Sequence, residues 1–129
     1  PGRNRLHAGD HRPLGKEHLI MEWTHDLACF FGGAVLTNAI PHFVSGVMGK
    51  PFQSPFAKPP GQGLSSSTVN VLWGSFNAVV GYGLIVWIGT FDPRATDQVA
   101  AAGLGVLLTG LLSARLFGRL NGGNAPPKT

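Results

Sequence analysis

The chain alternates between long uncharged, mostly apolar stretches and shorter polar segments. Residues 27–48 and 69–91 contain no charged side chain, and residues 95–118 hold an apolar centre that runs from Val99 to Ala114. A helix needs about 20 mostly apolar residues to cross roughly 30 Å of membrane hydrocarbon. The pattern therefore predicts an all-α fold: a three-helix transmembrane bundle with antiparallel neighbours and spans at about these three ranges.

Residues at the edges of the spans match the usual signals for helix ends. The hydroxyl side chains at 65–68 are placed to cap the second helix. Asp92 followed by Pro93 fits an N-cap residue and the first position of the third helix, which implies a tight hairpin between the second and third spans. Asn121 and Gly122 predict the end of the third helix.

The segment 49–68 is predicted to be a Pro/Phe-rich interfacial loop. Its prolines forbid a regular helix, and Phe52 and Phe56 are interleaved with Lys50 and Lys58. This composition suits a segment that keeps its rings in the membrane interface and its ammonium groups in water. The loop is either a plain connector or a surface that binds a partner or lipid.

Residues 1–20 differ from the rest because they are polar and have no apolar period. We expect them to be disordered, or a non-native upstream extension that precedes a start at Met21. Lys16-Glu17 can be encoded by a ribosome-binding sequence just upstream of that position. Residues 21–120 would then form the three-span membrane domain, and residues 121–129 a flexible tail.

Composition narrows the class of protein further. Charged residues make up 12% of the chain, about half of the roughly 25% that is typical of soluble domains. The formal net charge of +4 is divided between the tails and one loop, which argues against nucleic-acid binding. The sequence holds no hydrolase, P-loop or metalloprotease motif, so we do not expect an enzyme. No carboxylate lies deep in a span, which argues against a proton-coupled exporter.

The distribution of charge predicts an orientation in a bacterial inner membrane. If the chain starts at Met21, the flank before the first span carries acidic residues, whereas Lys50, Lys58, Arg115 and Arg119 follow the first and third spans. The positive-inside rule then places the N-terminus outside and the C-terminus in the cytoplasm.

Small residues recur at helical spacing in each span and predict the faces on which the helices pack. Such residues let helix backbones approach closely where lipid removes the hydrophobic drive for association. The third span has two such stripes, which suggests one contact within the protomer and one with another copy. The predicted packing residues are Gly33, Thr37, Ser45, Asn70, Gly74, Gly81, Gly105, Thr109, Gly110 and Ala114.

Four polar residues at membrane depth form the main candidate site: Asn38, His42, Asn70 and Asn77. With the first two spans antiparallel, His42 and Asn77 come to similar depths, so we expect these two side chains to face each other. One interpretation is a polar clamp, since polar groups in hydrocarbon need partners. The other is a cofactor site in which His42 binds haem iron, a metal or a quinone oxygen, with Asn38 and Asn77 orienting it.

The candidate site lacks the second ligands that several cofactors need. Haem between helices usually has two axial ligands, and His42 is the one histidine within a span. A zinc site needs three or four clustered ligands, and no such cluster is predicted. We therefore predict no cofactor, with haem or quinone at His42 as the alternative.

The block from Asn38 to Gly49, with Pro51 to Gly61 and Leu64 to Gly74, resembles small uncharacterised integral membrane proteins of proteobacteria. The resemblance runs from about Met21 to the tail and implies no catalytic residues. More loosely, the His42-Phe43 pair resembles proteins of the DoxX type, which usually have four spans.

These observations favour a non-enzymatic structural or accessory subunit of the bacterial inner membrane. Its expected partners are the lipid bilayer and either further copies of the chain or a larger membrane complex. The alternatives are a cofactor- or quinone-associated redox subunit that uses His42, and a small oligomeric channel or carrier.

Overall fold

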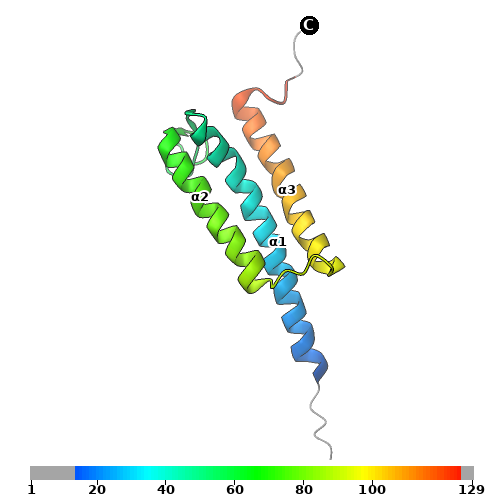
Figure 1. Cartoon of the computed structure of the whole chain (residues 1–129). Coiled ribbons are helices and arrows are strands. Elements are labelled where there is room, and N and C mark those ends of the chain that lie inside the picture. Colours follow the sequence, from blue (N-terminus) through cyan, green and yellow to red (C-terminus); the bar gives the residue numbers. More distant parts are fainter. Residues whose placement is uncertain (1–13, 126–129) are drawn as a thin grey trace, which may run out of the picture.

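The computed structural model describes residues 14–125, which form three long helices joined by two connectors (Figure 1). The helices are α1 (Leu14–Val47), α2 (Ser67–Gly83) and α3 (Thr96–Asn121), and α2 continues into a π-helical turn, η1 (Leu84–Ile88). Two short strands, β1 (Phe52–Gln53) and β2 (Leu64–Ser65), lie between α1 and α2. All three helices are long and apolar enough to cross a membrane. The predicted all-α membrane fold is confirmed.

Helix α1 lies in the middle, with α2 on one side and α3 on the other (Figure 1). Phe43 lies against Gly74 and Leu36 against Gly81, so α1 and α2 run antiparallel. Phe30 lies against Gly105 and Thr37 against Gly110, so α1 and α3 run parallel. Consecutive helices therefore run in opposite directions along the chain, but α3 packs on α1, to which it is parallel, rather than on α2. Helix α3 packs on α1 because glycine on each helix lets the two backbones approach closely, at Gly105 of α3 and Gly33 of α1.

The contact between α1 and α2 uses the face that the sequence predicts. The buried residues of α2 are Asn70, Gly74, Asn77 and Gly81. A Cβ atom added to Gly74 would lie 2.6 Å from the backbone nitrogen of Phe43, which is closer than real Cβ contacts. The two backbones therefore touch at Gly74, with a polar residue on the same face of α2 on either side.

The contact between α1 and α3 is also made by glycines. A Cβ atom on Gly33 would overlap the carbonyl oxygen of Ala102, and one on Gly105 would overlap the carbonyl oxygen of Phe30. Gly105 is the one buried residue of α3 within the described part of the chain. Thr109 and Gly110 are half-buried, and Ala114 is exposed. The predicted small-residue stripes of α3 are therefore covered by α1 near Gly105 and become more exposed towards the C-terminal end of α3.

Two of the predicted helix ends are confirmed. Ser66 is the N-cap of α2, where its hydroxyl accepts a hydrogen bond from the backbone nitrogen of Val69 at 3.4 Å. Helix α3 ends at Asn121, and Gly122 follows with a φ of 75°. Glycine suits this position because a left-handed backbone carries no Cβ penalty there.

The predicted cap at Asp92-Pro93 is wrong, because these residues form a turn ahead of α3. The carboxylate of Asp92 accepts a hydrogen bond from the backbone nitrogen of Arg94 at 2.9 Å, which closes an Asx turn. Gln98 in the first turn of α3 ties down the connector instead. Its side chain accepts from the Asp92 backbone nitrogen at 2.7 Å and donates to the Gly89 carbonyl oxygen at 3.2 Å.

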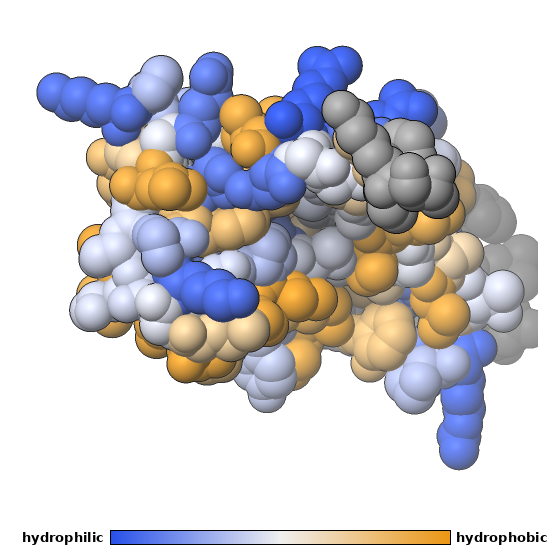
Figure 2. Space-filling view, turned by 90° about the horizontal axis from the view of Figure 1, so that it is seen from above, coloured by the Kyte–Doolittle hydropathy of each residue, from blue (hydrophilic) through white to orange (hydrophobic). Residues whose placement is uncertain are grey.

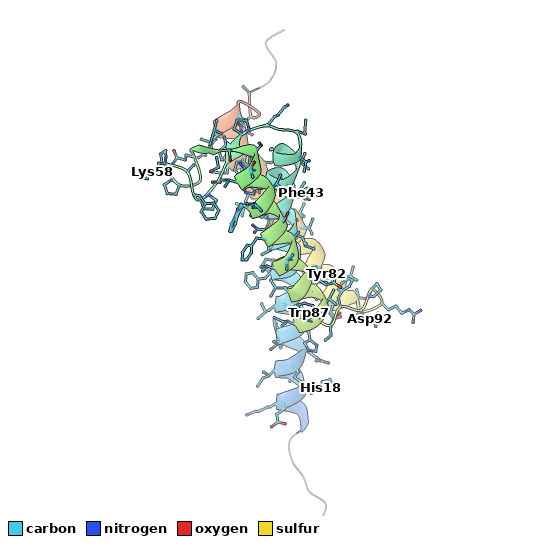
Figure 3. All side chains as sticks on the ribbon, turned by 60° about the vertical axis from the view of Figure 1, so that its left-hand side comes forward. His18, Phe43, Lys58, Tyr82, Trp87 and Asp92 are labelled. Carbon is cyan, nitrogen blue, oxygen red and sulfur yellow. The ribbon has the colours of Figure 1, made fainter. Side chains whose placement is uncertain are left out.

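Helix α1 begins at Leu14, earlier than the predicted span, so residues 14–20 are helical rather than disordered. An already formed helix extends at little cost per residue, and His18 and Glu22 pair across one turn at 3.1 Å. This segment continues beyond the level of the α2–α3 connector, where Figure 3 shows His18. Residues 1–13 and 126–129, on which the rest of the predicted extension and the last part of the predicted tail fall, lie outside the described residues.

The predicted 49–68 loop contains no regular helix before α2 begins at Ser67, as its prolines predict, but it is more than a plain connector. Strands β1 and β2 pair antiparallel, with Phe52 opposite Ser65 and Gln53 opposite Leu64. Gln53 is buried against the end of the bundle, while Lys58 reaches outwards (Figure 3). The segment therefore forms a cap over one end of the helices.

Candidate functional site

The candidate site lies under this cap and begins with the contact between His42 and Asn70. The Nδ1 atom of His42 lies 2.9 Å from the Oδ1 atom of Asn70. His42 comes from α1 and Asn70 from the first turn of α2, and both side chains are buried. This hydrogen bond joins the two helices at the capped end of the bundle.

Asn70 also holds the ends of the cap. Its Nδ2 atom lies 3.0–3.1 Å from three backbone carbonyl oxygens, those of Phe52, Ser65 and Ser66. Carbonyl oxygens only accept hydrogen bonds, so this side of the amide must be the NH₂ group. The Oδ1 atom therefore faces His42, and because Oδ1 can only accept, the Nδ1 atom of His42 must donate. In the neutral imidazole, the single ring proton sits on Nδ1 and the lone pair on Nε2.

Asn38 and Asn77 form a second polar pair one turn deeper in the bundle. The Nδ2 atom of Asn38 donates to the Oδ1 atom of Asn77 at 3.2 Å, and Asn77 donates to the carbonyl oxygen of Trp73 at 2.8 Å. The predicted pairing of His42 with Asn77 is therefore wrong, because each has another partner. In an antiparallel pair of helices, residues at similar distances from the cap meet. Asn38 and Asn77 both lie farther from the cap than His42 does, so they pair with each other.

Aromatic rings from three elements surround His42. The ring centroids of Phe52, Phe117 and Trp73 lie 5.5, 6.2 and 6.5 Å from that of His42, and each ring meets the imidazole edge to face. The cap, α3 and α2 each supply one of these rings. The histidine is thus held in one orientation by its bond to Asn70 and by rings on several sides.

Two polar contacts in the cap are not predicted from the sequence. Gln53 and Asn121 exchange hydrogen bonds between their side-chain amides, at 3.1 and 3.4 Å, and so tie the cap to the end of α3. The hydroxyl groups of Ser54 and Ser65 lie 2.6 Å apart. The nearest sequence signal is the presence of glutamine and serine between prolines, which reads as an ordinary loop composition.

A cavity of about 250 Å³ lies between the three helices and the cap. Asn38 and His42 line it from α1, Trp73 from α2 and Phe117 from α3, and Gln53 and Ser54 are among its residues from the cap. It therefore combines buried polar side chains with aromatic walls, as small-molecule sites commonly do.

The Nε2 atom of His42 opens onto this cavity. His42 is 3% exposed, and Nε2 makes no hydrogen bond with the residues that the structure describes. In those residues, every side-chain nitrogen or oxygen that is shut off from solvent has a hydrogen-bond partner. Nε2 must therefore border open space, and His42 lines the cavity. In the neutral imidazole, the site therefore presents one lone pair, in a fixed direction, to a ligand that enters the cavity.

The polar side chains around the cavity are suited to hydrogen bonding with a ligand. Within residues 14–125, no three His, Cys, Asp or Glu side chains are grouped as metal ligands. Cys29 is fully buried elsewhere, where its sulfur packs against Gly89 at the other end of the bundle. The polar side chains that line the cavity carry one imidazole, side-chain amides, a hydroxyl and the indole of Trp73.

A second hollow, of about 390 Å³, runs along the outside of the α1–α3 contact. Thr37, Pro41 and Ser45 line it from α1, and Gly110 and Ala114 from α3. These include four of the predicted packing residues. Thr37 lies against Gly110 across the helix contact, and all four border the groove. We call this hollow the α1–α3 groove.

Comparison of this chain with protein-family models, with characterised proteins and with solved structures gives no match.

Proposed function

We propose that this chain is a non-enzymatic accessory protein of a bacterial inner membrane, and that it associates with a second copy through the α1–α3 groove. The groove supports the proposal because its walls carry small residues, Thr37 and Ser45 on α1 and Gly110 and Ala114 on α3. A partner helix can approach such walls closely, which is the main source of helix association in lipid.

Cysteine crosslinking in intact membranes tests this association. In a Cys29→Ser background, Ala114→Cys places a thiol in the groove, and Leu112→Cys places one on an exposed part of α3 outside it. We expect a covalent dimer with Ala114→Cys and little with Leu112→Cys. A monomer with both variants overturns self-association, and so does equal crosslinking of the two.

The distribution of charge supports an orientation with the N-terminus outside and the C-terminus in the cytoplasm. Lys50 and Lys58 lie at the capped end, as do Arg115 and Arg119 near the end of α3. Seen from above, long hydrophilic side chains reach outwards around this end (Figure 2). The described acidic residues lie at the opposite end, where Figure 3 shows Asp92. Basic residues at one end favour the cytoplasmic side for that end.

A second candidate function is a cofactor- or quinone-associated membrane subunit that uses His42. One observation favours it: the Nε2 lone pair of a buried histidine opens onto a cavity. An absorption spectrum of the purified protein tests the haem form of this candidate. A Soret band that is lost in His42→Ala supports haem, and a protein without visible absorption excludes it.

A further inference from the structure

We propose that the cavity under the cap binds a single phenolic ring, whose hydroxyl group donates a hydrogen bond to the Nε2 atom of His42. This inference rests on the second candidate function and specifies its ligand. A phenol and the reduced form of a quinone share the required group, an aromatic hydroxyl.

The hydrogen-bond direction follows from Asn70. Its NH₂ group is used by three backbone carbonyl oxygens, so its Oδ1 atom takes the proton on Nδ1 of His42. The neutral ring then offers an acceptor at Nε2 and nothing to donate. A ligand carbonyl, as in an oxidised quinone, would bring a second lone pair against the first. A ligand hydroxyl instead donates its proton to Nε2 and completes a hydrogen bond.

A second acceptor faces the same cavity. Asn38 lines it and uses its NH₂ group on Asn77, while its Oδ1 atom makes no hydrogen bond with the described residues. The side chains on the α1 wall therefore offer acceptors, at Nε2 of His42 and Oδ1 of Asn38. This pattern favours a ligand that brings its own donors.

The size and walls of the cavity favour one ring. Its volume is about 250 Å³, whereas an apolar cavity of about 150 Å³ is already enough for benzene. One ring with a few substituents fits, and a four-ring macrocycle such as haem is too large. Trp73 and Phe117 supply aromatic walls, which suit a flat apolar ring because aromatic pairs stack or meet edge to face.

Titration of the full chain in nanodiscs, with ¹⁵N-labelled histidine, tests the proposal directly. The probes are 4-ethylphenol and 4-ethylanisole, which share a ring but differ in the hydroxyl hydrogen. We expect 4-ethylphenol to shift the Nε2 resonance of His42 saturably and to bind at least about tenfold more tightly than the anisole, because the anisole leaves a buried acceptor without a donor. Equal binding of the two probes, or no shift at His42, overturns the proposal.

A pair of matched variants locates the binding. His42→Phe keeps a ring but removes the acceptor, and the preference for the phenol should disappear. His25→Phe makes the same change at the opposite end of α1, near Thr90, and should keep the preference. Circular dichroism checks that both variants fold. If His42→Phe does not fold, the titration of the unsubstituted chain still decides between phenol and anisole.

The outcomes separate this proposal from the candidate function beneath it. A cofactor can co-purify with the chain and be lost in His42→Ala while 4-ethylphenol does not bind. That result supports the second candidate function and overturns the phenolic-ring proposal. If 4-ethylphenol does bind, trimethylhydroquinone identifies the source of the ring. Tighter binding of trimethylhydroquinone than of 4-ethylphenol indicates a quinol, and the reverse indicates a simple phenol.

Discussion

The Nδ1 atom of His42 donates a hydrogen bond to Asn70, whose amide group in turn holds the backbone of the cap. One asparagine thus joins α1, α2 and the 49–68 segment. The same bond fixes which nitrogen of the histidine faces the cavity. Asn70, which the sequence predicts as part of a polar clamp, therefore also determines which nitrogen of His42 is available to a ligand in the cavity.

Replacement of Asn70 should cost more stability than replacement of Asn77. Asn70→Ala removes the side-chain donor to the carbonyl oxygens of Phe52 and Ser65 and leaves Nδ1 of His42 without its acceptor. The carbonyl oxygen of Ser66 keeps the backbone nitrogen of residue 70 as a donor. Each unsatisfied buried group costs about 1–3 kcal/mol. Asn77→Ala removes the single bond between helices to Asn38, worth roughly 0.6–2 kcal/mol in a membrane. Unfolding by denaturant in mixed micelles measures both changes. Equal losses would contradict the central role of Asn70.

The tautomer of His42 can be observed without any ligand. Nitrogen NMR of ¹⁵N-histidine should show that the neutral form of the His42 ring carries its proton on Nδ1 and none on Nε2. In Asn70→Ala this preference should weaken, because the acceptor that fixes it is gone. A neutral His42 protonated at Nε2 in the unsubstituted chain would contradict the hydrogen-bond direction.

Glycine substitutions in α3 should separate its packing face from its lipid face. Gly105→Ala forces a methyl group into the carbonyl oxygen of Phe30, whereas a methyl group on Gly103 meets nothing within 4 Å. Overpacking typically costs about 1–3 kcal/mol, so Gly105→Ala should destabilise the bundle. Gly103→Ala should be neutral, or stabilising by up to about 1 kcal/mol through helix propensity. The free energy of unfolding of each variant checks this, and a neutral Gly105→Ala would argue against close contact of α1 with α3.

The amide pair of Gln53 and Asn121 should couple the cap to the end of α3. A double-mutant cycle with Gln53→Ala and Asn121→Ala should give a coupling free energy of about 0.5–1.5 kcal/mol, the usual worth of a side-chain hydrogen bond. Ser75→Ala, on a half-buried position of α2, serves as the uncoupled control with either variant. Additive losses at Gln53 and Asn121 would show that the two amides act independently.

Reporter fusions test the orientation. A cytoplasmic reporter fused after Asn121 should be active, and one fused in the α2–α3 connector near Asp92 should not be. A reporter that requires export should give the opposite pattern. An exported C-terminus would overturn the proposed orientation and leave the fold unaffected.

Several features followed from local patterns in the sequence. Span positions depend on runs of apolar residues, and the buried face of α2 depends on residues at helical spacing, so Gly74 and Gly81 could be assigned from the sequence. The cap at Ser66 and the end at Gly122 are local as well. By contrast, the turn at Asp92 depends on the reach of Gln98 from the next helix, which no local pattern contains.

Three apolar helices, the polar residues at depth in the first two and the positions of the packing glycines can all be assigned from the order of residues. The position of α3 on α1, the pairing of His42 with Asn70 rather than Asn77, and the cavity between the cap and that ring appear only when the helices are packed together. The physical reason is that hydropathy and helical period act along one helix. The partner of a side chain depends on the offset and rotation between two helices, which are set by all their contacts together.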